Sequence, residues 1–258
     1  MRERKSEGHN SKDKVRRDKA LNGLSPKGNI PIPSGRELIK LYGSMRSVFG
    51  FLNWWPGDTE DEIFIGAILT QQTTWLNVEK AISNLKGSRA LSIRALSRME
   101  TSDIEKLVRP SGYYRQKAGR LSSLSSKIIS DYGSLSGLLG LDTKILRKTL
   151  LDMRGIGPET ADSIVLYAAG KPTFVIDAYT RRIMHRVFGI PADISYDSLK
   201  AVFESALPQK LELYKDFHAQ FVELGKRYCK TKPACGECPA AKLCRYANPK
   251  FAPARLKA

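Results

Sequence analysis

The residues most able to do chemistry begin with the stretch RGIGP at 154–158, which lies between two runs of helical periodicity at 143–153 and 158–169. Glycine permits positive φ angles and lets a backbone approach another molecule closely. Proline suits the first helical position, where the N–H group has no partner within the helix. The pattern predicts a helix–hairpin–helix whose backbone N–H groups and positive helix end form an anion site. A corner that uses its glycines only for packing is the alternative.

The charge of the chain indicates which anion this is. There are 43 Lys and Arg residues against 26 Asp and Glu, which gives a net charge of +17. Such an excess favours a polyanionic partner, nucleic acid first and an anionic membrane second, with a solubility device as the alternative. We therefore predict that Gly155, Ile156 and Gly157 contact a DNA phosphate, which positions a duplex without reading its sequence.

A carboxylate follows the hairpin in the stretch FVIDAYTRR at 174–182. Asp177 comes directly after an apolar run and before a helical pattern, so its side chain suits the N-cap of that helix. The same carboxylate could face DNA held by the hairpin as a catalytic group. The two roles are compatible, and Asp177 is the candidate catalytic residue.

All four cysteines of the chain lie near its end with the spacing C-x5-C-x2-C-x5-C. Four thiolates so close together, without a nearby histidine, suit a tetrahedral metal ion or an iron–sulfur cluster. Structural zinc sites usually have two C-x2-C pairs and this run has one, so a [4Fe–4S] cluster is favoured over zinc. Disulfides rank last, because no secretory signal directs the chain to an oxidising compartment. The candidate ligands are Cys229, Cys235, Cys238 and Cys244.

Helical periodicity runs through nearly all of the chain after residue 34. Amphipathic patterns occur at 34–50 and 75–87, and each is closed by a glycine. The one β-branched cluster, TFVI at 173–176, is too short to build a sheet. An all-α fold is predicted.

Composition limits where such a protein works. Residues 1–28 hold nine basic and four acidic residues and almost no large apolar groups, which predicts a disordered basic arm. No apolar stretch reaches the roughly 18 residues that a membrane span needs. With 41% apolar and 27% charged residues the chain has a composition typical of a soluble globular protein. We expect it in the cytoplasm or nucleoid, or in the nucleus of a eukaryote, and neither secreted nor on a membrane.

In this order, the hairpin, the aspartate and the four-cysteine run resemble the helix–hairpin–helix DNA glycosylases, in particular their endonuclease III branch, over about residues 34–250. The resemblance implies two α-helical domains with a DNA-binding cleft between them. A six-helix domain at 54–171 would carry the hairpin, and 29–53 with 172–258 would form an iron–sulfur cluster domain. It also implies double-stranded DNA with damaged bases as the partner, and extrusion of the target base. We expect a monomer.

The resemblance assigns roles to single residues. Asp177 matches the essential aspartate of the family, and Gln72 in LTQQT at 69–73 matches the residue that fills the gap left by a flipped nucleotide. Glu159 stands where members that also cut the strand carry a lysine, and a carboxylate cannot form the Schiff base with the sugar. Ala67 stands where adenine-mismatch glycosylases need a glutamate. The first cysteine spacing is x5, where the family usually has x6.

The tryptophans point to a substrate. The stretch WWP at 54–56, followed by a TQ-x-T-x-aromatic run, resembles the 3-methyladenine DNA glycosylases, in which such aromatics sandwich the flipped base. The resemblance implies a base pocket with Trp55 and Trp75, while Trp54 is assigned to the core. An N-alkylated purine is cationic, and stacking on aromatic faces favours a desolvated cation by about 1–2 kcal/mol.

These patterns together predict a DNA glycosylase of base excision repair that hydrolyses the N-glycosidic bond of an alkylated purine such as 3-methyladenine and leaves the strand uncut. Two alternatives stay open. One is an endonuclease III-type glycosylase and lyase for oxidised pyrimidines. The other is a non-catalytic DNA-binding module.

Overall fold

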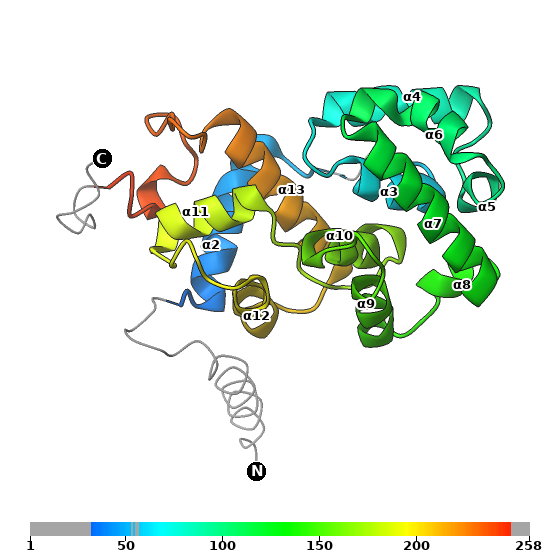
Figure 1. Ribbon diagram of the computed structural model, residues 1–258. Helices are drawn as coiled ribbons and strands as arrows, with labels where there is room; N and C mark the ends of the chain where they lie inside the picture. The colour runs from blue at the N-terminus through cyan, green and yellow to red at the C-terminus, as the bar shows by residue number, and fades with distance from the viewer. Residues whose placement is uncertain (1–31, 53, 55–56, 249–258) are drawn as a thin grey trace, which may run out of the picture. The chain divides into compact units, whose positions relative to one another are not determined.

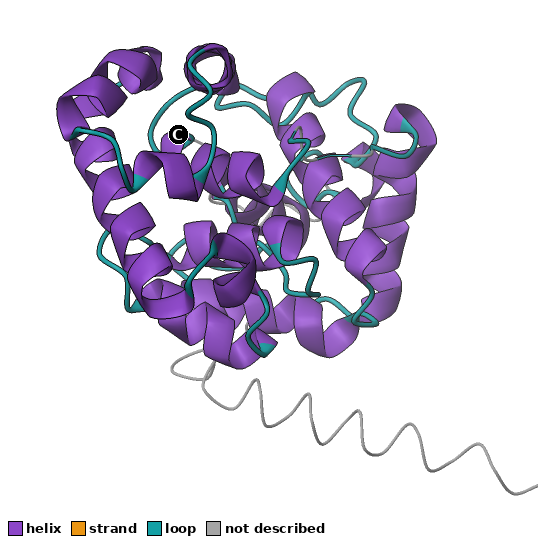
Figure 2. Ribbon diagram, turned by 90° about the vertical axis from the view of Figure 1, so that its right-hand side faces the viewer, coloured by secondary structure: helices purple, strands orange, loops and turns teal. Residues whose placement is uncertain are grey.

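The computed structural model describes residues 32–52, 54 and 57–248. The predicted basic arm at 1–28 and Trp55 lie outside these residues. Every regular element in the described part is a helix, and Figure 2 shows helices joined by loops without a strand. The all-α prediction is confirmed. None of the described helices combines the length and the apolar character that a membrane crossing requires.

The chain divides into two compact units, with divisions after Trp54 and after Thr173. One unit is a continuous segment, and the other combines the residues before it with those from Phe174 onward (Figure 1). The hairpin belongs to the continuous unit, whereas Asp177 and the cysteines belong to the other.

The continuous unit is built around α3 (Glu60–Leu69), in which every residue from Phe64 to Leu69 is buried. A helix that is apolar all round belongs in the interior. The other elements are α4 (Trp75–Gly87), α5 (Ile93–Leu96), α6 (Thr101–Val108), η1 (Arg109–Ser111), α7 (Tyr114–Tyr132), α8 (Leu135–Leu139), α9 (Thr143–Leu151), α10 (Pro158–Ser163) and η2 (Ile164–Ala168). α7 packs against α5, α6 and α3, and α4 packs against α6 and α3.

The predicted helix–hairpin–helix is formed by α9, the turn after it and α10. α9 begins at Thr143 because the Asp142 side chain accepts the Lys144 N–H at 3.0 Å. The sequence predicts one regular helix over 158–169, but the chain leaves the α-helix after Ser163 and continues as the π-helix η2. All five residues of η2 are buried. The wider turn points more consecutive side chains into the core than the 3.6-residue period of an amphipathic helix allows.

The discontinuous unit contains α2 (Gly35–Phe49), α11 (Ala178–Phe188), α12 (Tyr196–Ala206), α13 (Leu211–Arg227) and η3 (Ala241–Leu243). α13 packs against α2 and α11, and ten of its residues are buried. Its aromatic side chains join a cluster in which the Phe174 and Phe203 rings stack at 3.9 Å and the Phe217 and Phe221 rings stack at 4.9 Å. This packing fixes α13, on which several polar residues of the candidate site lie.

Candidate functional site

In the hairpin, one buried side chain packs into the core, and a glycine lies on either side of it. Ile156 is buried in the core of the continuous unit. Gly155 has φ 91°, and a Cβ there would lie 2.1 Å from Arg120 Nε. Gly157 has φ −92°, which any residue adopts, and no atom lies within 4 Å of the place its Cβ would take. Positive φ therefore explains Gly155 alone, and Gly157 leaves open space before the N-terminus of α10.

The loop after α3 is tied to both sides of the hairpin by Gln71. Its Nε2 donates to the Gly155 carbonyl at 3.1 Å and to Thr160 Oγ1 at 3.0 Å, while its Oε1 accepts from Arg120. Sequence reasoning singled out Gln72 in the LTQQT stretch and missed Gln71 and Arg120. No signal in the sequence says which of two adjacent glutamines points inward.

Gln72 and Tyr113 are exposed residues with left-handed backbones, at φ 55° and 46°. Tyr113 is 62% exposed and forms the N-cap position of α7. A left-handed non-glycine residue costs of order 1–3 kcal/mol and persists only where the surrounding structure holds it. The exposed Arg89, after α4, has the same backbone conformation at φ 52°.

The ammonium group of Lys117 binds a backbone carbonyl shortly before each of these two residues. This buried side chain on α7 donates to the Leu69 carbonyl at 2.8 Å and to the Ser111 carbonyl at 2.7 Å. Leu69 is the last residue of α3 and precedes Gln72, and Ser111 ends η1 shortly before Tyr113. Burial, with a smaller effect from Arg120, lowers the pKa of Lys117 to about 8. One buried cation thus fixes the starts of both loops.

Asp177 occupies the N-cap of α11, as predicted. Its Oδ1 accepts the Thr180 N–H at 2.6 Å, and its side chain is 12% exposed. The remaining oxygen, Oδ2, points towards His218 of α13, whose Nε2 lies 3.7 Å away. The carboxylate is thus held by a helix N-terminus on one side and faces an imidazole on the other.

His218 is a functional candidate that no pattern in the sequence singles out. The side chain is 4% exposed. Burial lowers the pKa of His218, and the Asp177 carboxylate opposes this by raising it. Trp54, which was assigned to the core, is half-buried with its ring centroid 5.7 Å from that of His218. The Lys226 ammonium lies 6.0 Å from the centroid of the Trp54 ring.

The segment that leads to Trp54 is fixed by two further residues of α13. The buried Asp216 accepts the Leu52 N–H at 2.8 Å and the Tyr42 hydroxyl at 2.5 Å, and Gln220 donates to the Gly50 carbonyl at 2.7 Å. Burial first, and then the Asp216 hydrogen bond, raises the pKa of Tyr42 to about 12. A single helix therefore positions both Gly50–Leu52 and the imidazole beside Asp177.

The remaining predicted positions lie as follows. Trp75 is the first residue of α4 and is partly buried against the core of the continuous unit. Glu159 is exposed in the first turn of α10. Ala67 is buried in α3. Trp55 lies outside the described residues.

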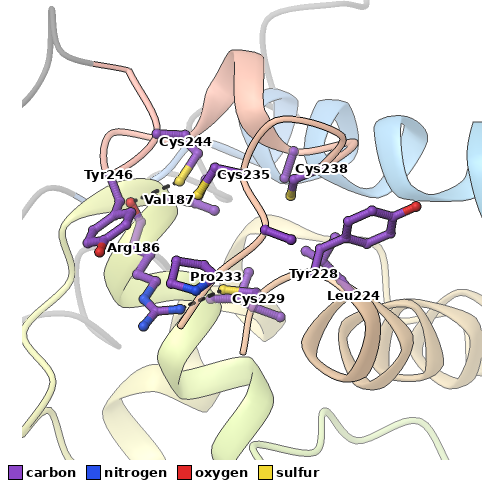
Figure 3. Close-up of a pocket in the computed structure, with 14 residues that line it drawn as sticks. Arg186, Val187, Leu224, Tyr228, Cys229, Pro233, Cys235, Cys238, Cys244 and Tyr246 are labelled. Atoms are coloured by element: carbon purple, nitrogen blue, oxygen red, sulfur yellow. Dashed lines mark hydrogen bonds between the residues drawn. The ribbon is translucent and has the colours of Figure 1, made fainter. Parts of the chain in front are cut away.

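The four cysteines line one cavity, together with residues of α11 and α13 (Figure 3). All four are free thiols; Cys229 and Cys244 are buried, and Cys235 and Cys238 are half-buried. Burial raises the pKa of the Cys238 and Cys244 thiols, and the neighbouring cysteines add to it, whereas backbone N–H groups lower it. Within the described residues, no three His, Cys, Asp or Glu side chains are grouped to hold one metal ion.

The donors around this cavity suit sulfur ligands. The Arg186 guanidinium donates to Cys229 Sγ at 3.4 Å and to the Lys230 carbonyl at 2.6 Å. Backbone N–H groups of Ala240, Tyr246 and Ala247 also reach the thiols. Thiolates are the soft ligands that iron–sulfur clusters and zinc require, and such hydrogen bonds stabilise their charge. The chemistry of the lining therefore suits a thiolate-bound group, while the four side chains of the described residues are not gathered around one point.

Comparison with known proteins gives a consistent picture. Residues 65–209 match the model of the HhH-GPD superfamily of base excision DNA repair proteins. A predicted DNA repair glycosylase of Methanocaldococcus jannaschii is 42% identical over 209 residues, which are 80% of this chain and 95% of that protein. Endonuclease III of Thermotoga maritima is 28% identical over 185 residues, which are 71% of this chain and 82% of that protein.

Among solved structures, the 3-methyladenine DNA glycosylase of H. pylori, bound to 1,N6-ethenoadenine, is similar to this chain with a TM-score of 0.65 and 31% sequence identity. The match covers 76% of this chain and 98% of that one.

Proposed function

Because this chain belongs to the HhH-GPD superfamily of base excision DNA repair proteins and is a DNA glycosylase of that superfamily, we propose that it removes alkylated purines such as 3-methyladenine from double-stranded DNA without cutting the strand. The observation that carries the proposal is a pair of carboxylates. Asp177 is largely buried at the start of α11, and Glu159 is exposed at the start of α10 where a strand-cleaving enzyme would need an amine.

Asp177 has the properties that hydrolysis of a glycosidic bond requires. As the bond between the base and the sugar breaks, positive charge develops on the sugar, and a fixed carboxylate stabilises it or activates the attacking water. The Thr180 N–H keeps the carboxylate in one orientation. An N-alkylated purine leaves as a neutral base, since it starts as a cation, so little acid catalysis is needed.

Absence of strand cleavage follows from the chemistry of Glu159. Cleavage by this class of enzyme needs an amine that attacks the sugar and forms a Schiff base. A carboxylate has no nitrogen to form one. We therefore assign an abasic site as the product.

The base pocket is proposed to contain Trp55 and Trp75, which would stack on the two faces of the flipped base. The partial burial of Trp75 leaves part of its ring available. Support for an alkylated purine comes from the H. pylori relative, which is named for 3-methyladenine.

DNA would be held through the hairpin and the loop after α3. We assign phosphate contact to the backbone of Gly155, Ile156 and Gly157, and the open space before Gly157 supports it. Gln72, exposed and left-handed, is assigned to the gap left by the flipped nucleotide.

We propose a [4Fe–4S] cluster bound by Cys229, Cys235, Cys238 and Cys244, on the basis of the shared cavity and its N–H donors. When bound, the cluster would supply rigid cross-linking of the loop that carries its ligands. Lys230, Lys232 and Lys242 would then form a fixed basic surface for the DNA backbone. A brown protein with broad visible absorbance and about four irons per chain supports the cluster, whereas a colourless protein with one zinc contradicts it.

The function is tested on a panel of duplexes that each contain one lesion, assayed with and without alkali. The expected result is release of 3-methyladenine and strand breaks only after alkali. Asp177→Asn should lower the rate by about 100-fold or more, and it should fold normally because asparagine is an equally good N-cap. Asp142→Asn, the same change at the N-cap of α9, is the matched control and should keep full activity.

Two other outcomes would replace the proposal. Cleavage of oxidised-pyrimidine duplexes without alkali, together with a covalent adduct trapped by borohydride, would assign an endonuclease III-type activity. No turnover on any lesion, with equal binding of damaged duplex by the wild type and Asp177→Asn, would assign a non-catalytic DNA-binding module.

A further inference from the structure

We propose that His218 is a positioning residue for Asp177, acting as a neutral partner that holds the carboxylate in place without cancelling its charge. The inference rests on the proposed catalytic role of Asp177. Its first support is geometric, because the two side chains come from different helices and face each other at 3.7 Å between Nε2 and Oδ2. Both are shielded from water, with exposed fractions of 4% and 12%.

The two oxygens of Asp177 have separate surroundings. Oδ1 accepts the Thr180 N–H at 2.6 Å in the cap of α11. Oδ2 faces the imidazole. A carboxylate with one restrained oxygen still rotates about its bond to Cβ, and a second group at the other oxygen limits that rotation. His218 is the group placed to do so.

His218 itself is held by its neighbours. Its helix, α13, is fixed by the aromatic cluster, and the Trp54 ring lies against the imidazole at 5.7 Å. A side chain held in this way fixes the position of the one it faces.

Among the described residues, the charged group that faces the imidazole at a known distance is Asp177. From α11 the group that faces it is Asp177. On α13, the carboxylate of Asp216 accepts hydrogen bonds from Tyr42 and Leu52, and the Lys226 ammonium lies over the Trp54 ring. The Trp54 ring, which lies against the imidazole, carries no charge.

The charge state of His218 decides whether Asp177 is available for catalysis. Burial lowers the pKa of His218 more than Asp177 raises it, so the imidazole is neutral at neutral pH. Neutral imidazole has no net charge, and at 3.7 Å its contact with Oδ2 is longer than a hydrogen bond, so the negative charge of Asp177 stays in place. Protonated imidazole would form an ion pair with Asp177 and weaken its stabilisation of the sugar cation. Acid should therefore inactivate the enzyme through His218.

The test compares three histidine variants in single-turnover assays on a 3-methyladenine duplex from pH 5 to 8. His218→Leu removes the imidazole, and we expect base release to slow about 10- to 100-fold with DNA affinity within about twofold. His218→Gln keeps a neutral N–H donor that cannot titrate. It should keep most of the rate at pH 7.5 and lose the fall in rate that the wild type shows in acid, where its imidazole, with a pKa lowered by burial, becomes protonated. His185→Gln, on α11, is the control and should match the wild type.

A wild-type rate in His218→Leu, or an unchanged acid limb in His218→Gln, would overturn the inference. Should His218→Leu fail to fold, the pH profile of His218→Gln decides the question alone. If the wild type acts on a different lesion, the same comparison is made on that lesion. In that case the proposed substrate is wrong, but the role of His218 is still tested.

A second readout does not depend on activity at all. In NMR titrations of histidine side chains, Asp177→Asn should lower the pKa of His218 further, because it removes the charge that raises it. An unchanged His218 titration in Asp177→Asn would show that the two groups are not coupled. This measurement separates failure of the inference from failure of the proposed glycosylase activity.

Discussion

The two glycines of the hairpin should respond differently to the same substitution. Gly155 has a left-handed backbone and a side chain packed against its α-carbon, whereas Gly157 has ordinary dihedral angles and open space. Gly155→Ala should therefore lower the stability of the fold. Gly157→Ala should instead block the approach of a ligand to the N-terminus of α10.

The expected magnitudes follow from these geometries. An alanine at φ 91° costs about 1–2 kcal/mol. Displacing Arg120 also disturbs the hydrogen bonds of Gln71, each of which contributes about 1 kcal/mol. A total of about 2–4 kcal/mol lowers the unfolding temperature of a chain of this size by roughly 5–15 °C. Gly157→Ala replaces an N-cap glycine by a poorer cap, which costs about 0.5–1 kcal/mol.

For DNA affinity, by contrast, Gly157→Ala should have the larger direct effect. If a phosphate approaches the backbone at Gly157, a methyl group there prevents a hydrogen bond to a charged oxygen. Such a bond contributes about 1.5–3 kcal/mol, which corresponds to a loss in affinity of roughly 10- to 100-fold. The measurements are thermal unfolding by circular dichroism, and fluorescence anisotropy with a labelled duplex at one fixed salt concentration.

Gly87→Ala at the end of α4 serves as the control, because a Cβ there also meets no atom within 4 Å. It should leave DNA affinity unchanged and should raise stability by no more than about 1 kcal/mol, the helix propensity of alanine over glycine. Wild-type DNA affinity in Gly157→Ala would show that the hairpin is a packing corner and that DNA is held elsewhere. Wild-type stability in Gly155→Ala would refute the stereochemical reasoning itself.

Three further outcomes are expected. Lys117→Met should lower the free energy of unfolding in urea by about 2–4 kcal/mol, since two buried carbonyls lose their donor. The pKa of Lys117 is lowered to about 8 in the folded state, so above that pH the unfolded state binds more protons than the folded state. The wild type should therefore gain stability from pH 8 to 10, whereas Lys117→Met should not. Asp216→Ala should cost about 2–4 kcal/mol in the same assay and slow base release, because Leu52 and Tyr42 lose their acceptor. Cys244→Ser should abolish the visible absorbance of the purified protein.

Local patterns in the sequence predicted the helices well, because helix starts and stops depend on neighbouring residues. The helix expected at 75–87 is α4, Trp75–Gly87. The helix expected at 34–50 is α2, which begins after the Ser34 capping box and ends before Gly50. The N-cap role of Asp177 was predictable for the same reason.

Partnerships between distant buried polar groups were not predictable in this way. His218 faces Asp177 only because α13 packs against α11, and Lys117 reaches Leu69 only because α7 packs against α3. In the sequence each is one polar residue in an amphipathic helix, which is the pattern of an exposed side chain. The π-helix η2 was not predictable from the sequence either, because its apolar residues fit the pattern of a regular amphipathic helix.

The discontinuous unit connects its cysteines to its catalytic candidate through two helices. Asp177 caps α11, and Arg182 of the same helix donates to the Cys229 carbonyl at 2.7 Å. α13 carries His218 and ends two residues before Cys229. Both members of the Asp177–His218 pair therefore lie on helices whose other ends are bonded to the cysteine loop. A group bound by the cysteines would need no part in the chemistry to affect the rate, because loosening that loop would free both helices that hold the pair.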